Sequence, residues 1–238
     1  MYDMKELTVL ILAGGLGARL RSVVADRPKV IAEVNGRPFL AYLLDQLASA
    51  GIERAILCTG YKAEQVQDAL GDRYGALHLA YSPEPVPLGT GGALRHALPL
   101  AESSLLLAMN GDSFCQVDLR EFIAAHRQGG AEATLCLCKA PDVSRFGQVL
   151  ADECGRVTRF QEKGAAQGPG WINAGLYLVS RKRLEKIPPG RPVSIERELF
   201  PQWIARGLRA YRTEGRFLDI GTPESYRIAE RFFRDAQP

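Results

Sequence analysis

Several features that would indicate other classes of protein are missing from this sequence. Its 238 residues include only 3 His and 5 Cys, and neither type is spaced as metal ligands or as a Ser-His-Asp or Cys-His set. No run approaches the ~18–20 apolar residues of a membrane span, and the start MYDMKELTV lacks a signal-peptide pattern. The net charge of +3 is too small to indicate nucleic acid or membrane as a partner. These absences predict a cytoplasmic protein with reduced, packed thiols.

The stretch LILAGGLGARL (10–20) ends an apolar run with three glycines and an arginine. Glycine lets a backbone approach a ligand closely, and the N–H groups of such a turn can bind an anion. Leu20 replaces the third glycine of a dinucleotide-binding loop, and the G-K-[ST] triplet of a Walker loop is missing. Arg19, Arg21 and Lys29 follow instead, and cations so closely spaced suit a ligand with several phosphates.

Strand-like and helix-like segments alternate through the first half of the chain. We expect strands at 7–13, 54–60, 77–82 and 104–112, and helices at 38–51, 62–71 and 90–101. Thr90 is the expected N-cap of the third helix. This alternation predicts an α/β fold with a doubly wound, mostly parallel sheet, in which ligands bind beyond the carboxyl ends of the strands.

The pattern loosens after a helix expected at 118–130. Shorter strand-like pieces, joined by turn residues, follow at 133–140, 147–152, 156–163 and 172–180. They predict a small mixed or antiparallel extension that faces the substrate. Helices are expected again at 194–207 and at the C-terminus, and no Pro/Gly/Ser linker or internal repeat interrupts the chain. We therefore expect a single domain over 1–238.

Two aspartates follow apolar segments and are candidate metal ligands. Asp112 lies beyond Gly111 in MNGDSF, and Asp219 precedes a Gly-Thr-Pro turn in RFLDIGTPESY. Mg²⁺ prefers one or two carboxylates together with phosphate oxygens, so this pair could bind one ion. Taken alone, each aspartate is explained equally well as a turn residue or a helix cap.

Polar residues in the second half have similar alternatives. The pair Glu162–Lys163 in FQEKG is by itself better explained as an exposed strand end. Asn173 lies in the apolar segment WINAGLY, and a buried Asn must be hydrogen-bonded, which a sugar hydroxyl could achieve.

Taken in order, these pieces resemble one family, the sugar-phosphate nucleotidyltransferases. The resemblance covers nearly the whole chain and rests on seven motifs, LAGGLGARL with PK downstream, PLGTGGAL, NGD, FGQV, FQEK, INAGLY and DIGTPESY. Each motif is weak alone, but seven in the family's order are highly specific. The resemblance implies a Rossmann-like fold of nucleotidyltransferase type A, with a nucleotide-binding half (1–115) and a sugar-phosphate-binding half (116–238).

The resemblance also implies roles for individual residues. An NTP and a sugar 1-phosphate are the implied substrates, with Arg19 and Lys29 acting on the reacting phosphates and Asp112 and Asp219 binding Mg²⁺. The other implied nucleotide-binding residues are Leu12, Ala13, Gly14, Gly15, Gly17, Gly89, Thr90 and Gly111. The implied sugar-phosphate-binding residues are Phe146, Gly147, Glu162, Lys163 and Asn173. A homo-oligomer is compatible with the sequence.

Within the family, the form RLRSVVADRPKV together with NGDSF resembles the D-glycero-D-manno-heptose 1-phosphate guanylyltransferases. The Pro and Thr that glucose 1-phosphate enzymes carry after the Arg-Leu pair are missing, and Val30 replaces the usual proline after Lys29. Mannose 1-phosphate guanylyltransferase and glucose 1-phosphate nucleotidyltransferase remain alternatives. A catalytically inactive regulatory subunit is a further alternative, but such subunits usually lose the lysine or an aspartate.

Glu84 precedes the glycine turn expected to face the base, in YSPEPVPLGTGGAL. Guanine offers adjacent N1–H and N2–H donors, which one carboxylate can accept together. This chemistry favours GTP as the nucleotide. The alternative is that Glu84 is a solvated loop residue and that backbone groups near Gly89 select the base.

Overall fold

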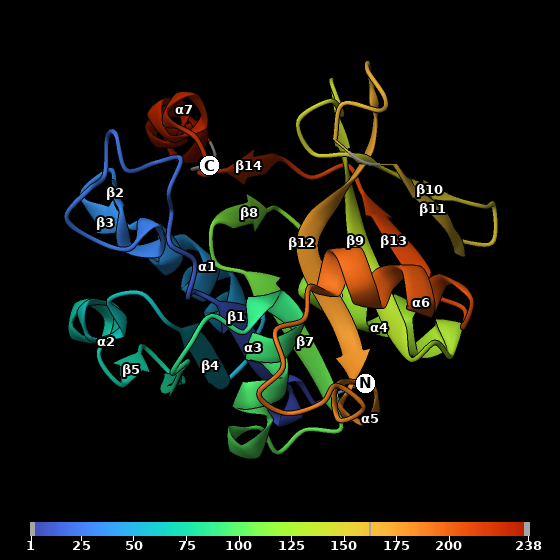
Figure 1. The fold of residues 1–238 in the computed structure, drawn as a ribbon, viewed down its shortest axis with the longest axis horizontal. Coiled ribbons are helices and arrows are strands. Elements are labelled where there is room, and N and C mark those ends of the chain that lie inside the picture. The colour runs from blue at the N-terminus through green and yellow to red at the C-terminus, as the bar shows by residue number, and fades with distance from the viewer. Residues whose placement is uncertain (1–2, 162, 236–238) are drawn as a thin grey trace.

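The computed structural model describes residues 3–161 and 163–235. Its centre is an eight-stranded sheet with the order β13-β9-β12-β7-β1-β4-β6-β5 (Figure 1). Its strands are β1 (Thr8–Leu12), β4 (Arg54–Thr59), β5 (Arg73–Tyr74), β6 (Leu77–Pro83), β7 (Leu105–Asn110), β9 (Ala133–Ala140), β12 (Gly170–Ser180) and β13 (Arg209–Thr213). Two-stranded sheets pair β2 (Glu33–Val34) with β3 (Arg37–Pro38), β8 (Ser113–Cys115) with β14 (Phe217–Asp219), and β10 (Gln148–Ala151) with β11 (Val157–Gln161).

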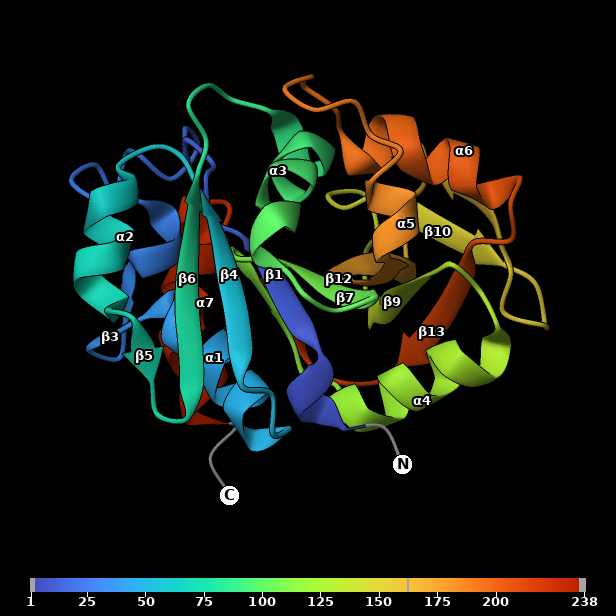
Figure 2. The same ribbon diagram turned by 90° about the horizontal axis from the view of Figure 1, so that it is seen from below.

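Helices cover both faces of the central sheet (Figure 2). One face packs against α1 (Phe39–Ser49), α2 (Ala63–Leu70), α4 (Leu119–Gly129) and α7 (Pro223–Arg234). The other packs against α3 (Gly89–Ala97), α5 (Arg181–Leu184) and α6 (Phe200–Ile204). Successive side chains of β7 alternate between the two cores, with Leu107 in the first and Leu106 and Ala108 in the second. A strand buried on both faces reads as a continuous apolar run, as the segment 104–112 does.

The directions of the strands confirm the expected doubly wound, mostly parallel sheet. The strands β7, β1, β4 and β6 are parallel neighbours, whereas β12 runs antiparallel to both β7 and β9. The chain extends the sheet from β1 to β4 and β6, then returns to add β7 on the opposite side of β1. The carboxyl ends of β1 and β7 therefore form the switch point at which such sheets bind ligands. The glycine loop follows β1 there, and Asp112 follows β7.

The expected extension is mostly part of the main sheet. The strands β9, β12 and β13 continue the sheet beyond β7, and the hairpin of β10 and β11 stands apart from it. The expected helix at 194–207 is divided into a π-helical turn (Ile195–Leu199) and the short helix α6. No helix in the described part of the chain is long and apolar enough to cross a bilayer.

The expectation that Thr90 caps α3 is wrong. Leu88 occupies the N-cap position, and Thr90 lies within the first turn of the helix. The Thr90 hydroxyl is instead bonded to residues of a distant segment, as described below. The helix also ends earlier than expected, at Ala97, and a 3₁₀ turn containing Pro99 follows it.

All five cysteines are free thiols, and four of them are buried. Cys136 and Cys138 point to the same face of β9, as their spacing predicts, and both lie in the core beside Cys115. Cys154, in the turn between β10 and β11, is exposed.

His126 gives the fold a predictable dependence on pH. It is buried on α4, where its Nδ1 lies 2.8 Å from Thr134 Oγ1, and burial lowers its pKa to about 4 from the ordinary 6.5. Between these values the unfolded chain binds a proton that the native protein does not. The contribution of His126 to stability is therefore complete above about pH 6.5 and is lost as the pH falls towards 4, by up to about 1.4 kcal/mol per pH unit. We expect His126→Gln to lose less stability than the wild type over this range in denaturant titrations. Parallel pH profiles of the two proteins would contradict this prediction.

Candidate active site

Two cavities adjoin at the carboxyl end of β7. The first has a volume of about 550 Å³, and the second about 640 Å³. Asn110 and Asp112 line both of them. Because β7 is central to the sheet and Asp112 directly follows it, this aspartate lies between two spaces large enough for small-molecule ligands.

The first cavity collects most of the residues predicted to bind a nucleotide. The predicted residues that line it are Leu12, Gly14, Gly15, Lys29, Glu84, Gly89, Thr90 and Asp112. Ala13 and Gly111 are buried behind its wall, and Gly17 does not line it. A Cβ on Gly111 would lie 2.6 Å from the Leu12 carbonyl oxygen, so this glycine permits the close approach of β7 to the end of β1.

The glycines of the first loop make room for protein groups. A Cβ on Gly14 would lie 2.9 Å from Glu84 Oε1 and 3.2 Å from the Gly60 nitrogen, so Gly14 allows three segments to meet. Gly17 has φ +60°, a left-handed conformation that favours glycine, and its Cα lies against the methylene groups of Lys29. The loop thus encloses the lysine stem and directs the lysine towards the junction of the two cavities.

Lys29 forms an ion pair with Asp112 at this junction. The lysine belongs to a 3₁₀ turn (Lys29–Ile31), and the side chains are 19% and 25% exposed respectively. Partial burial strengthens the attraction between them relative to a surface pair. The sequence motif alone gave no indication of this contact, because the two residues are 83 positions apart.

Asp219 lies next to Asp112 through a backbone connection. The strand β14 pairs with β8 so that Asp219 faces Ser113, and the Ile220 N–H donates to the Asp112 carbonyl at 2.9 Å. Burial and the negative charge of Asp112 raise the pKa of the Asp219 carboxyl above its ordinary value. Arg145 Nη2 lies 3.2 Å from Asp219 Oδ1 and partly offsets this repulsion.

The paired carboxylates fit the donor set that Mg²⁺ prefers. Two neighbouring negative charges repel each other, and a divalent cation bound between them relieves this repulsion. Mg²⁺ binds few protein ligands when phosphates supply the others. Within the described ranges no cluster of three or more His, Cys, Asp or Glu side chains is suited to a metal ion. Asp112 and Asp219 are therefore the candidate ligands for an ion shared with a substrate.

The second cavity brings together most of the residues predicted to bind a sugar phosphate. It is lined by Phe146, Gly147, Lys163, Asn173 and Asp219, together with Arg19. Glu162 lies outside the described residues. Arg19 was expected beside the nucleotide, but it is exposed and lines this second cavity rather than the first. It lies near Asp219, whose pKa its charge lowers in part.

Asn173 forms two hydrogen bonds within the protein. Its Oδ1 accepts from the Gly175 N–H at 3.0 Å, and its Nδ2 donates to the Tyr177 hydroxyl at 2.9 Å. Both bonds lie at an irregularity in the pairing of β12 with β9. The expected hydrogen bonding of Asn173 is therefore found within the protein. Asn173 also lines the second cavity, and its contact with a sugar hydroxyl stays a prediction.

Glu84 is not a solvated loop residue. It is half-buried on the wall of the first cavity, and its Oε2 accepts from the Leu88 N–H at 2.7 Å. Burial raises the pKa of its carboxyl, and the bond from Leu88 lowers it in part. Its other oxygen, Oε1, is directed towards Gly14 in the phosphate-loop candidate.

Thr90 connects the two cavities. Its Oγ1 donates to Glu196 Oε2 at 2.8 Å and accepts from the Ile195 N–H at 2.9 Å. Thr90 lines the first cavity, and Glu196 lines the second. The glycines after Thr90 allow this contact, since Gly91 N–H donates to the Val193 carbonyl at 2.8 Å with no side chain between them.

Substitution of Thr90 separates the hydroxyl from the size of the side chain. Thr90→Val leaves Glu196 Oε2 and the Ile195 N–H without this partner, so we expect a loss of about 1 to 3 kcal/mol in the free energy of unfolding. Thr90→Ser retains the hydroxyl and serves as the matched control, with a much smaller loss. Equal losses in the two variants, measured by denaturant unfolding, would show that the hydroxyl bonds contribute nothing.

Several cavity residues were not predicted from the sequence. Tyr61, Pro85, Val86, Pro87, Ala93 and Asn110 line the first cavity, and Gln148, Ser194, Glu196 and Arg197 line the second. Glu196 lies in a segment that was interpreted only as a helix. No local signal marks it, because its partner Thr90 is 106 positions away.

Known proteins are similar to this chain over nearly its whole length. A family model described as Nucleotidyl transferase matches residues 8–236. D-glycero-alpha-D-manno-heptose 1-phosphate guanylyltransferase of Aneurinibacillus thermoaerophilus is 36% identical over 226 residues, 94% of this chain and 97% of that protein. Mannose-1-phosphate guanylyltransferase of Mycobacterium tuberculosis is 37% identical over 225 residues, 93% of this chain and 63% of that protein.

Solved structures also match over nearly the whole chain. The crystal structure of HddC from Yersinia pseudotuberculosis has a TM-score of 0.86 and 37% sequence identity, and it covers 95% of this chain and 99% of its own. HddC complexed with GMP-PN has a TM-score of 0.85 with 35% identity, over the same shares of the two chains.

Proposed function

The chain belongs to the nucleotidyl transferase family, and from this premise we propose that it transfers a guanylyl group from GTP to D-glycero-D-manno-heptose 1-phosphate. The carrying observation is that two cavities meet at Asp112, with Lys29 on the first and Lys163 and Arg19 on the second. GTP occupies the first cavity and the sugar phosphate the second. The relatives named for heptose 1-phosphate and mannose 1-phosphate support this class of acceptor.

The reaction requires positioning and charge neutralisation, and no protein nucleophile. An oxygen of the sugar 1-phosphate attacks the α-phosphorus of GTP, a new P–O bond forms, and the bond to the β-phosphate oxygen breaks to release pyrophosphate. The attacking phosphate oxygen is already anionic at neutral pH, so no general base is needed. Lys29, Arg19 and Lys163 neutralise the charge of the assembled phosphates. This explains why the sequence lacks a usable catalytic histidine.

Asp112 and Asp219 are the proposed ligands of Mg²⁺, which supplies further neutralisation of the phosphate charge when it is bound. The contact of Lys29 with Asp112 supports a shared role, because it holds the lysine at the junction where the reacting phosphates would meet. Arg145 holds Asp219 in a corresponding way from the other side.

Glu84 is the proposed selector of guanine. Its half-buried carboxylate lines the first cavity, and each carboxylate oxygen can accept more than one hydrogen bond. Guanine N1–H and N2–H can both donate to this carboxylate, whereas adenine and uracil each present a single donor group beside an acceptor, which would face the carboxylate unfavourably. The complex of HddC with GMP-PN supports a guanine nucleotide for proteins of this kind.

A nucleotide panel tests the proposal. Pyrophosphate release is measured with GTP, ATP, UTP, CTP and dTTP, each with heptose, mannose and glucose 1-phosphate as acceptor. We expect GTP and heptose 1-phosphate to give the highest kcat/KM, and mannose 1-phosphate is the second candidate acceptor. Glu84→Gln should reduce the preference for GTP, while Glu64→Gln, an exposed control on α2, should not.

The outcomes separate the parts of the proposal. Preference for dTTP or UTP in the wild type would overturn the guanylyl assignment itself. Retained preference for GTP in Glu84→Gln would remove only the role of Glu84.

The free thiols support a cytoplasmic location as a further part of the proposal, because the cytoplasm keeps thiols reduced.

A further inference from the structure

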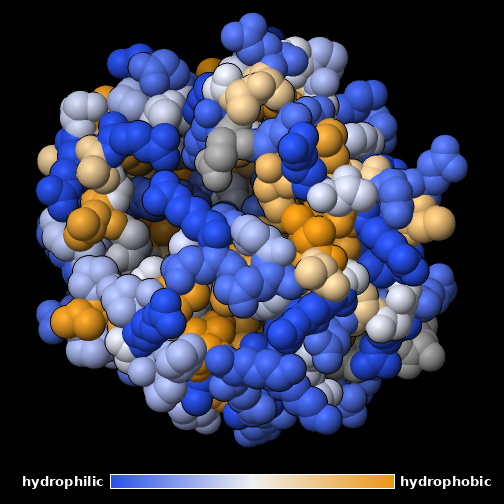
Figure 3. Space-filling view, turned by 45° about the vertical axis from the view of Figure 1, so that its right-hand side comes forward, coloured by the Kyte–Doolittle hydropathy of each residue, from blue (hydrophilic) through white to orange (hydrophobic). Residues whose placement is uncertain are grey.

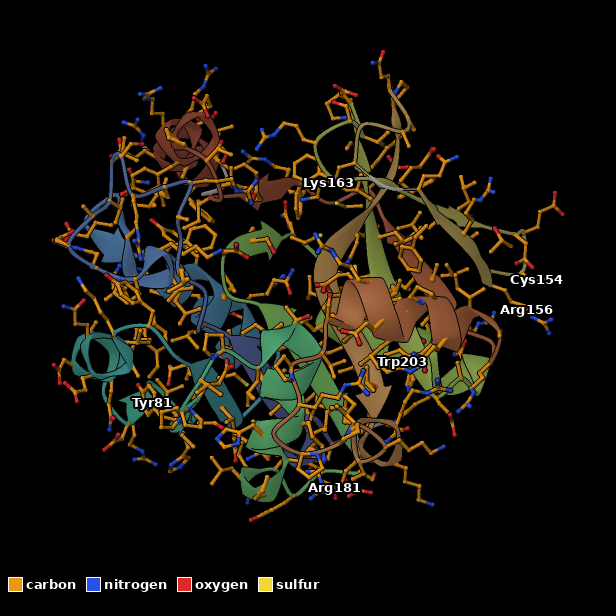
Figure 4. All side chains as sticks on the ribbon, viewed as in Figure 1. Tyr81, Cys154, Arg156, Lys163, Arg181 and Trp203 are labelled. Atoms are coloured by element: carbon orange, nitrogen blue, oxygen red, sulfur yellow. The ribbon has the colours of Figure 1, made fainter. Side chains whose placement is uncertain are left out.

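A third cavity lies on the opposite side of the segment 191–199 from the sugar-phosphate candidate. Its volume is about 170 Å³, and it is bounded by α5, the turn after it and α6. The segment presents Val193, Glu198 and Leu199 to this cavity, and Ser194, Glu196 and Arg197 to the second cavity. The two cavities have no lining residue in common. Trp203, which lines the third cavity, is well separated from Lys163 of the second (Figure 4).

Positive charge predominates around this cavity. Arg183, Lys186, Arg191 and Arg206 line it, with Glu198 as its only acidic lining residue within the described chain. Arg191 Nη2 and Glu198 Oε2 are 3.7 Å apart, and their side chains are 63% and 41% exposed. So loose a surface pair leaves most of the positive charge available. The side of the molecule brought forward in Figure 3 is largely hydrophilic, with apolar surface between the hydrophilic residues.

Arg183 distinguishes this cavity from an ordinary basic surface. The residue is only 5% exposed, and its Nη2 forms an ion pair with Glu132. Its Nε and Nη1 are buried and have no hydrogen-bond partner among the described residues. The guanidinium carbon lies 5.1 Å from the centroid of the Trp203 ring. The face of this ring stabilises the positive charge, but it is a much weaker hydrogen-bond acceptor than an anion.

A buried donor without a partner is unfavourable, and a guanidinium is satisfied best by an oxyanion. The planar guanidinium group of Arg183 can donate two parallel hydrogen bonds to a phosphate. The positive charges of Lys186 and Arg206, at the rim of the cavity, would attract the same anion over a longer distance. The volume of about 170 Å³ accommodates a phosphate group with a small organic substituent, but not a nucleotide. Ile187, Pro188 and Trp203 provide an apolar wall for such a substituent.

We propose that this cavity is a second anion site, which binds inorganic phosphate or a small phosphate monoester through Arg183, Lys186 and Arg206. The site is independent of the proposed transfer reaction. Its ligand contacts the back of the segment whose front carries Ser194 and Glu196.

Trp203 makes the site directly observable. The chain has 2 tryptophans, so Trp171→Phe leaves Trp203 as the single tryptophan, beside the Arg183 guanidinium. In this background, inorganic phosphate is titrated at constant ionic strength, balanced with KCl, while Trp203 fluorescence is recorded. We expect a saturable change in fluorescence. Glycerol phosphate, titrated in the same way, distinguishes a monoester from free phosphate as the better ligand.

The variants are chosen to leave the core intact. Lys186→Gln combined with Arg206→Gln removes two exposed rim charges, and it should weaken phosphate binding at least tenfold without changing basal activity. Lys182→Gln is the control, because it removes an exposed charge on α5, close to Lys186 in the chain, from a residue that does not line the cavity. Binding at the catalytic cavities would persist in both variants, so it cannot imitate the expected difference.

Three outcomes would overturn the proposal. They are a fluorescence change that does not saturate, a change of equal affinity in the double variant, and a change reproduced by KCl alone. The last would indicate charge screening or an adventitious ion only.

Discussion

Asp112→Asn is expected to reduce kcat by about 10²-fold or more while the protein stays folded. Asp112 lines both cavities, pairs with Lys29 and lies beside Asp219, so its charge affects each group that would contact the phosphates. The amide is the same size but has no charge, and it weakens metal binding as well as the hold on Lys29. Steady-state pyrophosphate release at saturating substrates measures the effect.

The control for this variant is Asp68→Asn, an exposed carboxylate on α2 far from the site. Circular dichroism and an unfolding curve show whether Asp112→Asn is folded. Removal of the Asp112 charge also relieves the repulsion that raises the pKa of Asp219, so Asp112→Asn should not be strongly destabilised. Turnover near that of the wild type, or full activity in EDTA, would contradict a metal-binding role for Asp112.

Lys29→Met is expected to have an effect of similar size on turnover. The lysine stem packs against Gly15 and Gly17, and its ammonium group is the cation paired with Asp112 at the junction of the cavities. Methionine retains most of the packing and removes the charge, so the loss reports on the charge. We expect kcat to fall by about 10²-fold or more, since one fixed cation opposite the reacting phosphates is removed.

Lys29→Arg provides the comparison, because it keeps the charge on a larger, planar group that the glycine loop cannot enclose in the same way. It should recover part of the activity. The double variant Lys29→Met, Asp112→Asn tests whether the two residues act together. If they do, its loss is much smaller than the product of the two single losses. A fully multiplicative loss would show that the ion pair has no part in the reaction.

The fold was predictable because each local signal agrees with the final packing. The apolar runs at 7–13 and 104–112 contain strands that are buried on both faces. Pro38 and Gly51 flank the helix α1, as expected for the segment 38–51. The details that failed depend on distant contacts. Thr90 is a residue type that commonly caps helices. In the structure its hydroxyl is instead hydrogen-bonded to Glu196 and Ile195, which belong to a segment that packs on α3.

The site was predictable to the extent that its residues follow strands or belong to a recognisable motif. Gly14 and Asp112 follow β1 and β7, which are neighbours in the main sheet, and Asp219 ends β14, which pairs with β8 directly after Asp112. Residues such as Tyr61 and Glu196 could not be found in this way, because only the folding of separate segments places them at a cavity. Arg19 was expected beside the nucleotide because it directly follows the glycine loop, but the loop after β1 places it at the second cavity.

Cys154 gives the protein a natural attachment point for a single probe. It is the exposed thiol, whereas Cys58, Cys115, Cys136 and Cys138 are buried, so a maleimide reacts with Cys154 first under native conditions. Cys154 lies at the turn of the β10–β11 hairpin, at the outer edge of the molecule (Figure 4). The opposite end of this hairpin contributes Val149 and Phe160 to the second cavity. A dye attached there, without any engineered cysteine, would report on movement of the hairpin as the acceptor binds.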